Sequence, residues 1–270
     1  MQNWLSYHFY PLETPDVFLT RAVRPFLEQY IWQKPGARAF FVRYDDEKGP
    51  HIRLRLRGEA EWLQETLEPA VEGWFAERGE RIAVPYEPET ARFGGEETMV
   101  WAEEYFHVST RVVLERLQRP AFTYGDALFD TLRMHLITAH AAGLDRKKAA
   151  WYFGQLCEQW IPLFFQPADD EESEAAMRTA LQENFENNFA PQAEHLRATL
   201  NNFWNMMEQA KFDAKEPEWL RWLRGNELIL KEFGDKLERV LPSLLHLNSN
   251  RLGVNNQDEV YMMFVLSKAL

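Results

Sequence analysis

Long hydrophobic runs are missing from this sequence of 270 residues, and cysteine is almost missing too. No stretch of about 18 apolar residues occurs, so we expect neither a transmembrane helix nor insertion into a membrane. The first residues have neither the basic region nor the apolar segment of a secretion signal. Cys157 is the only cysteine, which excludes a disulfide within the chain and a multi-cysteine metal site. We therefore predict a cytoplasmic location.

Basic residues are too few for a general nucleic-acid-binding protein. The chain has 30 Lys and Arg against 42 Asp and Glu, a formal net charge of -12, so we expect no direct nucleic-acid binding. Phosphate-binding glycine loops, nucleophile elbows and His-Glu-x-x-His zinc motifs are also missing. His135 and His140 are five positions apart, which places them on different sides of a helix, so a metal site there is not expected.

The most informative stretch is the alternating segment at residues 51–57, with the sequence HIRLRLR. As a β-strand it presents basic side chains on one face and aliphatic side chains on the other. The basic face comprises His51, Arg53, Arg55 and Arg57, and the apolar face comprises Ile52, Leu54 and Leu56. A row of arginines suits an anionic ligand or a carboxylate. An exposed sheet face whose arginines pair with surface Asp and Glu explains the pattern equally well.

The first third of the chain predicts an antiparallel sheet. Strands are expected at residues 5–10, 39–44, 51–57 and 81–86, with amphipathic helices at 14–32 and 59–78. This order is βαββαβ, the ferredoxin-like arrangement, which places both helices on one face of the sheet. The apolar face of residues 51–57 then meets the helices, and its arginine face is left for another part of the chain to cover.

From residue 96 onward the pattern is helical. No repeat, linker or domain boundary is evident, so we predict one α+β domain over residues 1–270, with a β-rich half at 1–95 and a helical half at 96–270. One of the expected helices covers residues 146–165, and the acidic run at 169–172 suits the start of another. The helical half is expected to roof the arginine face and create a pocket there.

Two stretches are expected to be loops. Residues 86–95 (YEPETARFGG) mix rigid and permissive residues, and their paired glycines allow positive φ before a helix. Residues 244–253 (LLHLNSNRLG) contain Asn248, Asn250 and Arg251, which can satisfy backbone groups of a loop. Both stretches can be purely structural, with Arg92 capping a neighbouring segment.

Three motifs together resemble a known family. They are HIRLR at residues 51–55, ETARFGG at 89–95 followed by AEEYF at 102–106, and HLNSNRL at 246–252. In order and spacing they look like the C-terminal elimination domain of class I lantibiotic dehydratases, also called the thiopeptide-type bacteriocin biosynthesis domain. The resemblance begins at Trp4 and runs to the C-terminus.

The resemblance implies a reaction and its residues. In that family, a separate and larger portion esterifies a Ser or Thr of a precursor peptide with glutamate from glutamyl-tRNA, and the elimination domain removes the glutamate. The essential arginines fall on Arg53, Arg55 and Arg92, and the essential histidine falls on His246. Four further polar residues in or next to these motifs are predicted to bind the substrate; they are His51, Arg57, Asn250 and Arg251. The glutamylation portion is absent from this sequence, so a separate glutamylation protein is the expected partner.

These residue types fit β-elimination. A base must reach the weakly acidic Cα proton, and cationic donors must stabilise the enolate and the leaving carboxylate. Arginine stays charged and presents a planar fork, and histidine titrates near neutrality. The sequence leaves open whether His246 is the base or the acid. The reaction needs no metal and no organic cofactor.

Two other functions remain open. Thiopeptide pyridine-forming enzymes share this fold and join two dehydroalanines by a [4+2] cycloaddition. Arg53, Arg55, Arg92 and His246 favour elimination, since a cycloaddition expels no glutamate. A non-catalytic peptide-binding partner is the third reading, and the charged residues weigh against it.

Overall fold

The computed structural model describes residues 3–164 and 171–270, and its contacts divide the chain into two compact units. The first unit comprises Met1–Phe122 and Lys231–Gly253, and the second comprises Thr123–Leu230 and Val254–Leu270. The expected division at residue 95 therefore marks the end of the β-rich segment but not a boundary between packed units. That residues 1–270 act as a single elimination-type domain stays a prediction.

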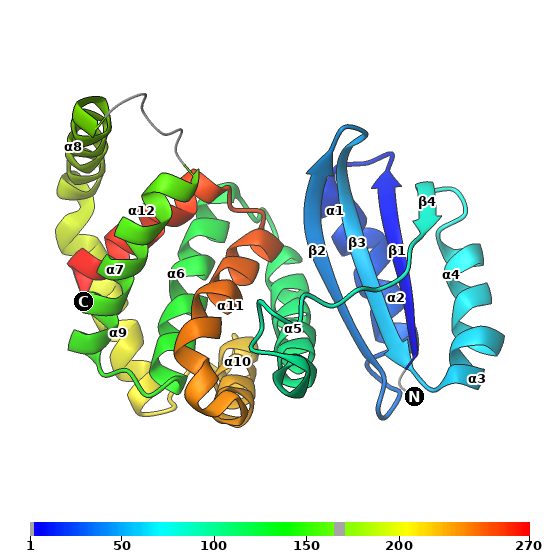
Figure 1. The fold of residues 1–270 in the computed structure, drawn as a ribbon. Coiled ribbons are helices and arrows are strands. Elements are labelled where there is room, and N and C mark those ends of the chain that lie inside the picture. The colour runs from blue at the N-terminus through cyan, green and yellow to red at the C-terminus, as the bar shows by residue number, and fades with distance from the viewer. Residues whose placement is uncertain (1–2, 165–170) are drawn as a thin grey trace. The chain divides into compact units, whose positions relative to one another are not determined.

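The first unit is built on a four-stranded antiparallel sheet in the order β2-β3-β1-β4 (Figure 1). The strands are β1 (Asn3–Pro11), β2 (Arg38–Asp46), β3 (Gly49–Gly58) and β4 (Gly79–Ala83). This topology confirms the α+β class and the predicted βαββαβ order. The last strand was expected at residues 81–86, but it begins and ends earlier, because its pairing with β1 runs from Gly79, opposite Pro11, to Ala83, opposite Tyr7.

One face of the sheet is the core of this unit. Ile52, Leu54 and Leu56 on β3 are fully buried, as their alternation predicts. Phe9 on β1 contacts the rings of Phe18 and Phe75, which come from the two helical segments that follow β1 and β3. These segments are α1 (Pro15–Phe18), η1 (Leu19–Val23) and α2 (Arg24–Tyr30), then α3 (Ala60–Trp62), η2 (Leu63–Leu67) and α4 (Glu68–Trp74).

Both helical segments contain a π-helical turn ahead of a proline. The turn η1 ends two positions before Pro25, and η2 ends two positions before Pro69. A proline ring has no N–H and clashes with the carbonyl four residues earlier, and a widened turn relieves that clash without breaking the helix. The sequence predicted continuous helices here, and the structure keeps them continuous by this local change.

Helix α5 (Glu96–Leu117) closes one part of the open edge of β2. The backbone N–H of Ala39 donates to Nδ1 of His107 at 3.1 Å, and that of Phe41 donates to Oγ1 of Thr110 at 3.3 Å. Burial lowers the pKa of His107 to about 4, so the ring is a neutral acceptor at neutral pH. Side chains of α5 thus occupy the hydrogen-bonding edge that a second strand would otherwise take.

Helix α11 (Leu237–Leu252) closes the rest of that edge. The side-chain amide of Asn250 accepts from the backbone N–H of Arg43 at 3.0 Å and donates to its carbonyl at 2.9 Å. Nε of Arg251 donates to the carbonyl of Phe41 at 3.0 Å. Two polar residues near the end of α11 therefore fix this helix against β2.

The expectation of a loop at residues 244–253 was wrong. Helix α11 continues to Leu252, and Gly253 ends it in the left-handed conformation with φ 80°. Asn248 is fully buried and binds the hydroxyls of Tyr105 and Ser109, while Asn250 binds β2. Asparagine disfavours helices when it is exposed, but tertiary hydrogen bonds override that weak preference here.

The second unit consists of helices and their connecting segments, with no strand among its described residues. Its helices are α6 (Tyr124–Ala141), α7 (Arg146–Phe164), α8 (Glu171–Phe189), α9 (Ala193–Glu208), α10 (Pro217–Ile229) and α12 (Asn256–Ala269). Trp204, Trp219 and Trp222 are almost completely buried in it, so much of the tryptophan content forms core. No helix of the described chain is long and apolar enough to cross a membrane. The predicted end of a helix at residue 165 and the first half of the acidic run at 169–172 lie outside the described residues.

Candidate functional site

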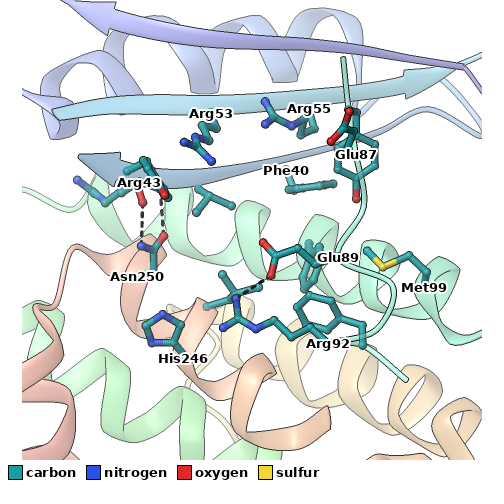
Figure 2. Close-up of a pocket in the computed structure, with 16 residues that line it drawn as sticks. Phe40, Arg43, Arg53, Arg55, Glu87, Glu89, Arg92, Met99, His246 and Asn250 are labelled. Carbon is teal, nitrogen blue, oxygen red and sulfur yellow. Dashed lines mark hydrogen bonds and ion pairs between the residues drawn. The ribbon is translucent and has the colours of Figure 1, made fainter. Parts of the chain in front are cut away.

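A pocket lies over the arginine face of the sheet, entirely within the first unit (Figure 2). Its volume is about 220 Å³. Three sources supply its wall: strands β2 and β3, the segment at residues 86–93, and helices α5 and α11. The lining residues are Phe40, Val42, Arg43, Tyr44, Arg53, Arg55, Tyr86, Glu87, Glu89, Arg92, Phe93, Met99, Phe106, His246, Leu247 and Asn250. The structure thus brings Arg53, Arg55, Arg92 and His246 to one cavity.

Arg53 and Arg55 enter the pocket from β3 without a carboxylate partner among the described residues. Nε of Arg53 donates to Nε2 of His51 at 3.3 Å, and its guanidinium lies 3.3 Å from the centre of the Tyr44 ring. Arg55 donates to the carbonyl of Tyr7 at 3.3 Å and otherwise contacts neutral groups. Two adjacent cations are therefore held in place without being neutralised.

Electrostatics at these arginines favours an anionic ligand. Burial, and to a smaller extent the charge of Arg53, lowers the pKa of Arg55 to about 10. The side chain is still protonated at neutral pH, so burial and repulsion are unfavourable to it, and no carboxylate of the described residues offsets them. An anion entering the pocket relieves both effects, and arginine forks match the planar geometry of a carboxylate.

Arg92 comes from the segment that connects β4 to α5. Its Nη1 is 3.1 Å from a carboxylate oxygen of Glu89, and its Nε donates to Oγ of Ser243 on α11 at 3.1 Å. Gly94 and Gly95, with φ of 88° and 108°, turn the chain into α5, as the paired glycines predicted. Arg92 therefore carries a charge partner that a ligand carboxylate would have to join or displace, unlike Arg53 and Arg55.

His246 lies on α11, one helical turn before Asn250. Residues four apart share a helix face, so the bond between Asn250 and β2 also directs His246 toward the arginine face (Figure 2). The ring is partly exposed and lines the pocket. Asn250 lines the pocket too, but both ends of its amide are engaged by Arg43, so we assign it to holding α11 in place.

Three predicted substrate-binding residues do not line the pocket, and the structure gives each another role. Arg251 is fully buried and donates to the carbonyls of Phe41 and Leu247. His51 is 1% exposed and accepts a hydrogen bond from Arg53. The alternation of residues 51–57 identifies a face correctly but does not say which part of the face stays open.

Arg57 is the third of these residues. It is buried, and its guanidinium binds Glu103 at 3.1 Å and Glu104 at 2.6 Å, both on α5. Burial raises the pKa of the Glu103 carboxyl, and the charge of Arg57 opposes that shift. The end of the arginine face at Arg57 is therefore closed by ion pairs, as the structural explanation of the pattern predicted for the whole face.

Replacing Arg57 with leucine should destabilise the fold by about 3–5 kcal/mol, because a buried carboxylate loses its counter-ion. We expect a larger loss at pH 7.5 than at pH 5, since Glu103 can avoid the penalty by binding a proton at low pH. Chemical denaturation at the two pH values measures this. The double variant R57L/E103Q should lose less of the free energy of unfolding than Arg57→Leu alone at pH 7.5. An equal loss in the two variants would contradict the ion-pair explanation.

The sequence alone did not identify the apolar wall and the acidic residues of the pocket. Phe40, Phe93, Phe106 and Tyr86 form a connected set of ring contacts beside the arginines. Phe40 pairs with Arg55 across β2 and β3, so the register of a correctly paired hairpin would have indicated it. Glu87 and Glu89 had no comparable signal. No cluster of three or more His, Cys, Asp or Glu suited to a metal ion occurs in the described part of the chain.

Comparison with known proteins identifies the family. The family model for the C-terminal part of lantibiotic biosynthesis dehydratases matches residues 4–270. The chain belongs to this family. Among the sequence relatives of this chain is the subtilin biosynthesis protein SpaB of Bacillus subtilis. The two are 36% identical over 119 residues, which is 42% of this chain and 11% of SpaB.

Solved structures of similar fold include MibB, TbtD and TsrL. The tRNA-dependent lantibiotic dehydratase MibB from Microbispora sp. 107891 has a TM-score of 0.71 and 20% identity, over 99% of this chain and 28% of MibB. The pyridine synthase TbtD from thiomuracin biosynthesis has a TM-score of 0.74 and 19% identity, over 98% of this chain and 97% of TbtD. TsrL has a TM-score of 0.68 and 15% identity, over 100% of this chain and 94% of TsrL. At these identities, the likenesses show that this chain shares their fold.

Proposed function

We propose that this lantibiotic dehydratase domain eliminates glutamate from glutamylated Ser or Thr residues of a ribosomal precursor peptide, leaving dehydroalanine or dehydrobutyrine. The observation that carries the proposal is the pair Arg53 and Arg55. Both face the pocket with no carboxylate partner among the described residues, beside Arg92 and His246. A site that must hold an anionic group and expel a carboxylate needs this arrangement.

Each residue type has a place in the reaction. The Cα–H bond breaks, its electron pair forms the Cα=Cβ double bond, and the Cβ–O bond breaks as glutamate leaves as a carboxylate. In our proposal His246 transfers the proton, as base at Cα or as acid at the departing carboxylate. Arg53 and Arg55 stabilise the negative charge that develops on the enolate and on the leaving group. Before elimination, the same two guanidinium groups bind the free carboxylate of the glutamyl group, and Arg92 adds positive charge at the wall of the pocket.

The proposal requires a partner activity. The substrate is an ester of a precursor peptide, and forming that ester is a different reaction from removing its acyl group. A glutamylation activity that uses glutamyl-tRNA must therefore act before this site, as it does in the family that the sequence motifs resemble. The pocket binds the peptide ester and not the tRNA, which agrees with a formal net charge of -12.

A pyridine-forming cycloaddition is the second candidate. The observation in its favour is the likeness to TbtD, which extends over 97% of that protein, whereas MibB is matched over 28% of its length. The aromatic wall formed by Phe40, Phe93 and Phe106 would also suit a heteroaromatic substrate. Two uncompensated arginines weigh against cycloaddition, since that reaction expels no carboxylate.

Incubating the purified protein with two synthetic peptides separates the candidates. One peptide carries a glutamyl ester on a serine, and the other carries two dehydroalanines. Mass spectrometry should show loss of glutamate and formation of dehydroalanine from the first, with the second unchanged. Cyclisation of the second peptide with no reaction of the first would replace elimination by pyridine formation.

A further inference from the structure

The two arginines that carry the proposed function each contact a histidine. His51 is on β3, two residues before Arg53, and His8 lies directly opposite Arg53 on β1. The two imidazole rings stack with centroids 5.1 Å apart. Their Nε2 atoms contact different arginines: that of His51 is 3.3 Å from Nε of Arg53, and that of His8 is 3.4 Å from Nη2 of Arg55. The elimination mechanism above uses neither ring.

We propose that His8 and His51 are positioning residues. Their unprotonated Nε2 atoms accept hydrogen bonds from the guanidinium groups of Arg55 and Arg53, which orients both groups toward the pocket without compensating their positive charge. The idea rests on the proposed function only where it concerns what the arginines then bind. The protonation state of the two rings is a property of the protein itself, and it can be measured without any substrate.

The hydrogen bonds define the tautomers. An arginine guanidinium has donors and no acceptor, so Nε2 of each histidine must accept and cannot carry a hydrogen. The other ring nitrogen of His51, Nδ1, lies 3.2 Å from the carbonyl oxygen of Gly49 and must be the donor in that contact. His51 is therefore neutral with its proton on Nδ1. The same argument places a bare Nε2 on His8.

The surroundings of His8 keep its ring uncharged. The charged groups that face it are Arg53 and Arg55 on β3 and Asp46 at the end of β2. Burial, and then the charges of Arg53 and Arg55, lower the pKa of His8 to about 4. Asp46 is 3.8 Å from Nδ1 of His51, and it also accepts a hydrogen bond from Tyr10 at 3.0 Å. At His8, the charge of Asp46 opposes this shift less strongly than burial and the two arginines produce it.

Arg57 shows how carboxylate partners differ from histidine partners. On the same strand face, Glu103 and Glu104 hold Arg57 in place, and in doing so they compensate its charge. Neutral acceptors fix the direction of a guanidinium without lowering the positive potential around it. The stacked rings also have little freedom to move, because Tyr10 and Tyr44 contact His51 with centroids 4.6 Å and 5.4 Å away. The face is thus divided into a closed end and an open end that binds anions.

Nitrogen-15 NMR of the imidazole rings in the wild-type protein tests the inference directly. At pH 7 both His8 and His51 should show the neutral form with the proton on Nδ1, and His8 should remain neutral as the pH is lowered to 5. A proton on Nε2, or a charged ring at pH 7, in either residue would overturn the inference. This measurement holds whether or not the protein eliminates glutamate.

Substitutions supply the functional readout. We expect His51→Ala and His8→Ala each to lower kcat/KM for a glutamylated peptide about tenfold or more, since each removes a hydrogen bond to a charged group. Glutamine at either position should restore much of the activity, because its carbonyl oxygen can accept the hydrogen bond in place of Nε2. If the histidine only filled space in the fold, glutamine would not restore activity in this way. His195→Ala, at an exposed position of the second unit, is the matched control and should behave as wild type.

Two outcomes of these substitutions can be told apart. If the alanine variants fold and react like wild type, the positioning role is wrong. If wild-type protein does not eliminate glutamate at all, the proposed function fails instead. The positioning role is then decided by NMR and by the affinity of each variant for a peptide in which an amide replaces the glutamyl ester. Equal affinity of the alanine variants and wild type for that amide would overturn it.

Discussion

His246→Ala should slow glutamate loss by about 10²–10⁴-fold, the usual contribution of a general acid or base. The histidine lines the pocket that contains Arg53 and Arg55, on a helix fixed to β2 by Asn250 and Arg251. Its side chain takes no part in those fixing bonds, so the variant should stay folded. The rate is measured as the appearance of dehydrated peptide by mass spectrometry under single-turnover conditions.

Binding should separate this effect from a loss of substrate affinity. We expect His246→Ala to bind the amide analogue of the glutamylated peptide as tightly as wild type, because proton transfer is needed only in the transition state. His195→Ala again serves as the control for removing an imidazole. A His246→Ala variant that eliminates glutamate at the wild-type rate would remove this residue from the mechanism.

Arg53→Lys should be nearly as damaging as removal of the charge. Lysine keeps the positive charge but loses the planar fork that can hold two oxygens at once, and it cannot reproduce the contact with both His51 and the Tyr44 ring. Loss of one charged hydrogen bond, about 1.5–3 kcal/mol, corresponds to roughly 10- to 10²-fold in kcat/KM.

The exposed Arg224 provides the control, since Arg224→Lys changes the same atoms at a site in the second unit, remote in function from the pocket. Steady-state kinetics of both variants on one glutamylated peptide makes the comparison. Equal kcat/KM for Arg53→Lys and wild type would show that charge alone suffices, which contradicts carboxylate recognition by a fork.

Much of the fold was predictable because its patterns are local. Alternation at residues 51–57 correctly separated buried Ile52 and Leu54 from the arginine face, and the order of strands and helices gave the sheet topology. The loop assigned to residues 244–253 was wrong because Asn248 and Asn250 form hydrogen bonds to Tyr105 and to the backbone of Arg43. Bonds between segments so far apart along the chain leave no trace in local propensity.

The residues of the candidate site were likewise predictable only in part. Motif resemblance indicated Arg53, Arg55, Arg92 and His246, and the structure brings these residues to one pocket although 92 and 246 are far apart along the chain. Residue type could not distinguish Arg57 from the other arginines. That difference depends on Glu103 and Glu104 of α5, which lie over Arg57 only in the folded chain. Glu87 and Glu89 line the pocket because of the path of the segment that connects β4 to α5, and local sequence patterns did not predict that path.

Calorimetric binding of two matched peptides tests the central claim that Arg53 and Arg55 recognise the glutamyl group. Both peptides carry an amide in place of the ester, one with glutamate and the other with glutamine, so that they differ only in the free carboxylate. Wild-type protein should bind the glutamyl peptide about tenfold or more tightly, the value of a charged hydrogen bond, and the variant R53M/R55M should lose that preference. Equal affinity of wild-type protein for the two peptides would contradict the account.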